Sequence, residues 1–148
     1  MSFEATVRRV VKCSPERAYD LWTKPELISK WFCPKEMPSE VTMDPRVGGK
    51  FRFVVHYKPD DFFACTCEIR AMERPKRFAF SWQWDESSFD TGVSEVEVLF
   101  DAIPGGTAIT LTHSKMASDV SVERHGEGWG QVLNRFEEFS NESLEDQS

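Results

Sequence analysis

The stretch DPRVGGKFRF, residues 44–53, joins a tight bend to a strand and so sets the plan of the chain. Two adjacent glycines, Gly48 and Gly49, are typical of a place where the backbone takes a positive φ or where two segments approach closely. After them the sequence alternates, with the aromatic side chains of Phe51 and Phe53 on the same side. Period two indicates a strand. We therefore expect a bend, with a possible bulge, that opens a strand with one aromatic face.

The same alternation recurs on both sides of this stretch. From about residue 40 to residue 113 the connections between the alternating segments are short and polar, which predicts antiparallel neighbours in a meander. We expect seven strands, at residues 3–12, 40–43, 50–57, 62–72, 77–84, 93–102 and 107–113.

Helical signals flank this run of strands. Ser14-Pro15-Glu16 and Pro25-Glu26 are typical helix starts and predict two short helices after the first strand. Over residues 118–140 the apolar side chains recur at three and four residues, which predicts one buried helical face. That face carries Trp129, Val132, Leu133, Phe136 and Phe139.

Three glycines interrupt the last helical pattern. Gly126, Gly128 and Gly130 each cost roughly 1 kcal/mol in a helix interior. Two interpretations are open: the helix begins near Trp129, or a glycine lets the helix backbone lie close to the sheet.

The arrangement of these elements predicts an α+β fold with an internal cavity. A seven-stranded antiparallel sheet twists and curls, and its apolar face needs a cover, for which only the C-terminal helix is long enough. One helix about 10 Å across does not fill the concave side of so wide a sheet. We therefore expect a pocket between the sheet and the C-terminal helix.

Composition narrows the class of protein. A chain of 148 residues fits one domain, which we place at residues 1–140, followed by an acidic and disordered tail at 141–148. The net charge of −7 argues against a nucleic-acid partner. The sequence has no apolar run that could span a bilayer and no secretory signal at its start, so we expect a soluble, cytoplasmic protein with reduced cysteines and no membrane contact.

Six motifs occur in an order that resembles a known family. They are WFCP (31–34), DPRVGGKF (44–51), EIRAMERPKRFAFSWQW (68–84), VEVLF (96–100), GGTAITLTH (105–113) and HGEGW (125–129). Together they resemble the family similar to the C-terminal domain of the activator of the 90-kDa heat-shock protein ATPase, within the START-like (SRPBCC) superfamily. The resemblance implies a helix-grip fold, related to the birch pollen allergen, in which a curved sheet and a long helix enclose a ligand cavity.

The resemblance leaves three functions open. The first is the binding of a small hydrophobic or aromatic molecule without catalysis. The second is association with a heat-shock chaperone whose ATPase it modulates, and the third is a polyketide cyclase-like enzyme that uses a pocket histidine. A fold alone does not decide among them.

Candidate ligand-binding residues follow from the expected inner face. They are Trp31, Phe51, Phe53, Phe80, Trp82, Trp84, His113, His125, Trp129 and Leu133. Two histidines at a pocket could act as acid and base or, with Cys65 and Cys67, bind a metal; alternatively, each is a hydrogen-bonded structural residue. We assign no catalytic residue, no metal site and no cofactor from the sequence.

Overall fold

A computed structural model describes residues 3–58, 61–84, 92–116 and 118–145 of the chain. Its elements, in chain order, are β1 (Phe3–Val11), α1 (Pro15–Thr23), α2 (Pro25–Ile28), β2 (Ser39–Met43), β3 (Lys50–Lys58), β4 (Asp61–Glu73), β5 (Arg77–Trp84), β6 (Ser94–Ile103), β7 (Gly106–Met116) and α3 (Asp119–Glu145).

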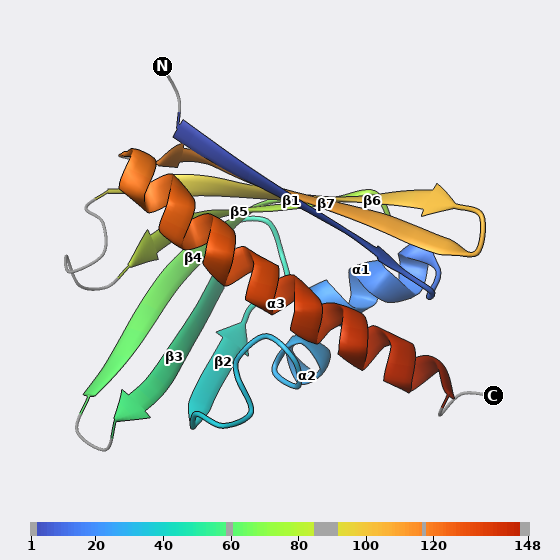
Figure 1. The fold of residues 1–148 in the computed structure, drawn as a ribbon, viewed down its shortest axis with the longest axis horizontal. Helices are drawn as coiled ribbons and strands as arrows, with labels where there is room; N and C mark the ends of the chain where they lie inside the picture. Colours follow the sequence, from blue (N-terminus) through green and yellow to red (C-terminus); the bar gives the residue numbers. More distant parts are fainter. Residues whose placement is uncertain (1–2, 59–60, 85–91, 117, 146–148) are drawn as a thin grey trace.

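The seven strands form one antiparallel sheet in the order β1-β7-β6-β5-β4-β3-β2. Strands that are neighbours in the sheet also follow one another in the chain, except β1 and β7. The first strand, β1, lies at the edge of the sheet and pairs with the last strand, β7. The sheet curves around α3, which crosses it diagonally, while α1 and α2 lie beside the C-terminal half of that helix (Figure 1). The α+β helix-grip fold predicted from the sequence is confirmed.

The glycine bend has the geometry that its sequence predicts. Gly48 has a φ of +86°, and a Cβ at Gly49 would overlap the backbone oxygen of Asp44. The Gly48 amide donates to the Ile69 carbonyl at 2.8 Å, and the Ile69 amide donates to the Gly49 carbonyl at 2.9 Å. The bend therefore pairs with β4 and directs Phe51 into the interior, where this side chain is fully buried.

The two short helices anchor the C-terminal half of α3 through aromatic rings. Ser14 caps α1, since its Oγ accepts a hydrogen bond from the Arg17 amide at 3.2 Å. The ring of Phe136 on α3 lies 5.7 Å from that of Trp22 and 4.9 Å from that of Trp31, between centroids. This cluster fills the space between α3 and the short helices, so the interior is solid at this end.

The long helix begins at Asp119, so the interpretation that it starts near Trp129 is wrong. Its glycines lie inside the helix, where a Cβ at Gly126 would stand 3.8 Å from the Cβ of Ala5 on β1. The guanidinium of Arg9, also on β1, donates to the side-chain oxygen of Asn134 at 3.0 and 3.1 Å. These contacts place α3 along β1 as well as across the sheet.

At its other end α3 continues to Glu145, through part of the stretch that the sequence analysis assigned to a disordered tail. The side chain of Ser140 is fully buried, and Asn141 accepts a hydrogen bond from the Lys12 amide at 3.4 Å. Burial and this contact favour helix beyond residue 140; residues 146–148 lie outside the described part. No helix among the described residues is long and apolar enough to cross a membrane.

Candidate functional site: a pocket between the sheet and α3

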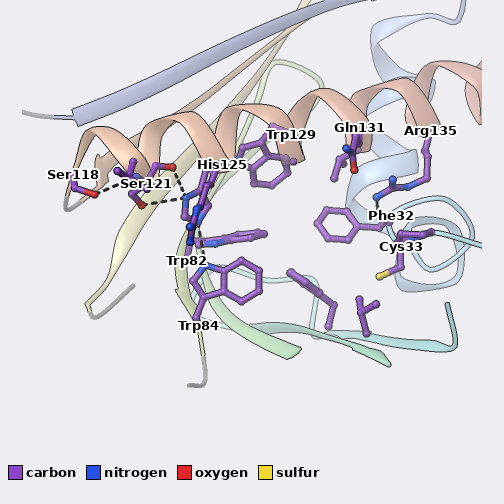
Figure 2. Close-up of a pocket in the computed structure, with 17 residues that line it drawn as sticks. Phe32, Cys33, Trp82, Trp84, Ser118, Ser121, His125, Trp129, Gln131 and Arg135 are labelled. Atoms are coloured by element: carbon purple, nitrogen blue, oxygen red, sulfur yellow. Dashed lines mark hydrogen bonds between the residues drawn. The ribbon is translucent and has the colours of Figure 1, made fainter. Parts of the chain in front are cut away.

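A pocket of about 310 Å³ lies between the sheet and the N-terminal half of α3. Figure 2 shows side chains of α3 along one side of it, Trp82 and Trp84 opposite, and Phe32 with Cys33 at one end. The lining residues are Phe32, Cys33, Pro34, Phe53, Val55, Trp82, Trp84, Ser118, Val120, Ser121, Arg124, His125, Gly128, Trp129, Gln131, Val132 and Arg135.

Aromatic rings form the main wall of this pocket. Trp82 on β5 is central, with its ring centroid 5.3 Å from that of Phe53 and 4.9 Å from that of Trp129. Its side chain is 6% exposed, and its indole nitrogen has no hydrogen-bond partner among the described residues. This part of the wall therefore offers flat apolar ring surface together with one indole N–H that has no partner in the described part of the chain.

Behind this wall, His113 on β7 has both ring nitrogens occupied. The indole N–H of Trp129 donates to Nδ1 of His113 at 2.9 Å, and an indole nitrogen can only donate. In the neutral ring the proton therefore lies on Nε2, which donates to the Ser94 oxygen at 2.6 Å. Ser94 in turn donates to the carbonyl oxygen of Trp82 at 3.2 Å. His113 is thus a structural link between β6, β7 and α3.

Burial keeps His113 neutral. The side chain has no exposed surface, and desolvation, with a smaller contribution from the nearby His125, lowers the pKa of His113 from 6.5 to about 3. A buried imidazole has no water to solvate the charged form, so protonation is costly. At neutral pH the His113 ring is therefore neutral, and its Nδ1 accepts the hydrogen bond from the Trp129 indole.

His125 on α3 repeats this arrangement at the pocket surface. The indole N–H of Trp84 donates to Nε2 of His125 at 3.0 Å, which leaves the proton of the neutral ring on Nδ1. Nδ1 lies 2.8 Å from the carbonyl oxygen of Ser121, one turn earlier on α3, and donates to it. His125 therefore fastens the end of β5 to α3, at one end of the pocket (Figure 2).

These hydrogen bonds limit the chemistry of the two histidines. A general base needs a lone pair directed at its substrate. In both rings the acceptor nitrogen is occupied by an indole N–H, although the ring centroids lie only 4.7 Å apart. The geometry is that of two indole-positioning residues in the pocket wall.

The opposite end of the pocket is formed by Arg135, Phe32 and Cys33 (Figure 2). The half-buried guanidinium of Arg135 donates from Nη2 to the carbonyl of Phe32 at 2.8 Å and from Nε to that of Trp31 at 3.3 Å. Burial lowers the pKa of Arg135, but an arginine stays protonated at physiological pH. Arg135 thus holds the segment after α2 against α3 and leaves a positive charge at the pocket.

The structure brings half of the sequence-predicted site residues to the pocket. Phe53, Trp82, Trp84, His125 and Trp129 line it, whereas Trp31, Phe51, Phe80, His113 and Leu133 do not appear in its wall. These last five are buried, at most 2% exposed, and form the core that supports the wall.

Trp31 borders a surface groove outside the solid cluster. Its indole N–H donates to the carbonyl of Leu21 at 3.0 Å, and the residue also lines this groove, which has a volume of about 670 Å³ and lies along the C-terminal half of α3. Charged residues that line this groove are Lys30, Lys35, Glu36, Arg135, Glu138 and Glu142.

Sequence reasoning missed the polar part of the pocket wall. Arg124, Gln131 and Arg135 line the pocket, yet a sequence-based division of α3 into one apolar and one polar face puts such residues on the solvent side. Their spacing could have revealed them. Residues 124, 128, 131 and 135 are four, three and four apart, so they form one stripe along the helix. The stripe borders the apolar face, where the pocket opens.

The cysteines suggested as metal ligands do not lie in the pocket wall. Cys65 and Cys67 on β4 are fully buried, with their sulfur atoms 3.9 Å apart. Among residues 3–58, 61–84, 92–116 and 118–145, no group of three or more His, Cys, Asp or Glu side chains is arranged to hold a metal ion. The pair behaves as small core side chains.

A curved sheet that grips a long helix beside a mainly apolar pocket defines a helix-grip protein of the START-like class. Residues 12–141 match the family model described as "Activator of Hsp90 ATPase homolog 1-like protein". The chain belongs to this family, as the six sequence motifs indicated. Among functionally curated proteins, none matches the chain.

Solved structures with the same fold come from several bacteria. Protein CV1439 from Chromobacterium violaceum has a TM-score of 0.83 at 18% identity, over 94% of this chain and 97% of that one. A putative uncharacterized protein from Rhizobium leguminosarum has a TM-score of 0.80 at 23% identity, over 94% of each chain. CalU16 from Micromonospora echinospora has a TM-score of 0.72 at 23% identity, over 97% of this chain and 79% of that one. At these identities the likeness concerns the fold.

Proposed function

We propose that the protein binds a small hydrophobic or aromatic molecule in the pocket between the sheet and α3. The observation that carries this proposal is the aromatic wall made by Phe53, Trp82 and Trp129 around an unfilled volume of about 310 Å³. Pockets for small ligands have volumes of roughly 300–1,000 Å³ and are mostly apolar with few polar groups. Both conditions are met here.

The volume also bounds the size of the ligand. An engineered apolar cavity of about 150 Å³ binds benzene. The pocket described here is about twice that size, at 310 Å³, so it has room for a body of two fused rings or a branched chain of similar bulk. Indole faces favour flat ligands, because stacked and edge-on ring pairs add about 0.5–1.5 kcal/mol to simple burial.

The hydrogen bonds of the two histidines support binding over catalysis. His113 and His125 orient Trp129 and Trp84, and neither ring has an unoccupied acceptor nitrogen in this arrangement. A polyketide cyclase-like reaction that depends on a pocket histidine as base would first have to break one of these bonds. The geometry therefore favours a binding module.

A calorimetric titration with the neutral two-ring compound 2-naphthamide tests the proposal. We expect saturable binding by the wild-type protein and its loss in Gly128→Leu, because a Cβ at Gly128 meets nothing within 4 Å and the residue lines the pocket. Glu127→Leu is the matched control, since the neighbouring Glu127 is exposed and is not part of the pocket wall. Equal binding by the two leucine variants would exclude this pocket as the binding site.

Family membership favours a second candidate function, association with a heat-shock chaperone of the 90-kDa class. Its test is independent of the pocket. Addition of the protein to the purified chaperone should raise ATP turnover, and the Gly128→Leu variant should do so equally if the contact uses the outer surface. Unchanged turnover together with no co-purification would remove this candidate.

A further inference from the structure

The charges around the pocket have one sign. The charged residues in its wall are Arg124 and Arg135, and no aspartate or glutamate among the described residues lines it. The chain as a whole carries 25 acidic and 18 basic side chains, so an even distribution would place acids at the pocket more often than bases. The pocket is therefore a positive, mainly apolar site on a negatively charged protein.

Arg135 is the arginine that the fold has fixed in place. Two of its nitrogens donate to the carbonyls of Trp31 and Phe32, and its side chain is half-buried. Among the described residues, no carboxylate oxygen lies within 4.0 Å of a guanidinium nitrogen of Arg135, the limit for an ion pair. Arg70, Arg74 and Arg77, by contrast, each have a carboxylate within that distance. Glu36 acts on Arg135 only through longer-range attraction; it lines the neighbouring groove, which Arg135 also borders, and not the pocket.

A half-buried charge without a counter-charge is unfavourable, and a ligand that covers it with apolar atoms makes it more so. A ligand with an acidic group removes this penalty, because guanidinium and carboxylate form strong, often bidentate hydrogen bonds. Arg124 is less suited to this role. It is exposed, and exposed ion pairs contribute little.

We propose that the ligand of this pocket is an amphipathic organic anion, with a flat apolar body against the indoles of Trp82 and Trp129 and a carboxylate paired with Arg135. This inference rests on the proposed function and names the chemical class of its ligand. The spacing suits such a molecule: Trp129 and Arg135 are six residues apart on α3, or ~9 Å along the helix axis at 1.5 Å per residue. In Figure 2 Trp129 and Arg135 extend from α3 at successive positions along the pocket.

The test compares two probes of the same shape, 2-naphthoate and the neutral 2-naphthamide, by calorimetric titration at pH 7.5. We expect the wild-type protein to bind naphthoate at least about tenfold more tightly, as a charge-assisted hydrogen bond implies. Raising the salt concentration should reduce this preference, since salt screens a partly exposed ion pair. Arg135→Gln should abolish the preference. The preference is the ratio of the two affinities of one variant, so a change in the pocket that affects both probes equally cancels in it.

Two variants sharpen the result. Arg124→Gln, at the other arginine of the wall, should keep the naphthoate preference. Arg135→Lys keeps the positive charge but loses the planar guanidinium, so it should retain part of the preference for naphthoate. It also takes the place of Arg135→Gln if that variant does not fold.

The outcomes separate the two proposals. Equal affinity of the wild-type protein for both probes would overturn the anionic ligand and leave the apolar pocket as a binding site. If the naphthoate preference were lost in Arg124→Gln and kept in Arg135→Gln, the proposal would also be overturned, because Arg124 and not Arg135 would then bind the carboxylate. Binding of neither probe would contradict the proposed function itself.

Discussion

Acid should destabilise this protein through the buried imidazole of His113. The pKa of this group is about 3 in the folded protein and 6.5 in a solvated chain. Between these two values the unfolded chain holds a proton that the folded protein does not. The stability that depends on neutral His113 is therefore fully present above pH 6.5 and is lost progressively as the pH falls toward 3.

The size of the effect follows from the width of that window. Each pH unit within it costs about 1.4 kcal/mol of unfolding free energy, so a fall from pH 7.5 to 4.5, which crosses two such units, costs about 3 kcal/mol. A small domain has roughly 5–15 kcal/mol in total. Losing the neutral ring would also remove the acceptor for the Trp129 indole, 2.9 Å from Nδ1.

Urea denaturation at pH 7.5 and pH 4.5, followed by tryptophan fluorescence, measures this loss. His113→Asn has no titrating group at this position, so its loss of stability between the two pH values should be about 3 kcal/mol smaller than that of the wild-type protein. Comparing each protein with itself cancels the direct cost of the substitution. An equal loss in His113→Asn and in the wild-type protein would refute the reasoning.

Three further substitutions test the packing around the pocket and the bend, each by chemical denaturation. Gly128→Ala should raise the unfolding free energy by about 1 kcal/mol, because the position lies inside α3 and a Cβ meets nothing within 4 Å; a loss would show that the helix is strained there. Gly49→Ala should lower the unfolding free energy by about 1–3 kcal/mol, because its Cβ would overlap the Asp44 carbonyl oxygen. An unchanged unfolding free energy would contradict the close approach of the backbone in this bend. Phe136→Ala should cost about 3–5 kcal/mol, since its fully buried ring packs against Trp31; a cost below about 1 kcal/mol would mean that the cluster repacks.

The local pattern of the chain was sufficient for the architecture. Alternation around Phe51 and the Gly48–Gly49 bend predicted a strand and its launching turn, and the structure confirms both, with a φ of +86° at Gly48. The apolar repeat at Trp129 and Leu133 likewise predicted the buried face of α3. Such signals are local because a strand or helix exposes its faces with a fixed period.

The sequence could not say which aromatic side chains border open space. Phe51, Phe80 and Trp82 all point to the concave side of the sheet, yet only Trp82 lines the pocket. The difference depends on where α3 lies and on where aromatic rings have already filled the interior, as Phe136 on α3 and Trp31 in the segment after α2 do.

By itself, therefore, the sequence determined the strands, the helices and the side of each that faces inward. The tertiary structure alone decided that His113 and His125 accept indole hydrogen bonds, and that Arg135 reaches the pocket from a helix face that pattern assigns to solvent. The physical reason is distance along the chain: periodicity reports the faces of one element, whereas a pocket depends on how elements far apart in sequence meet.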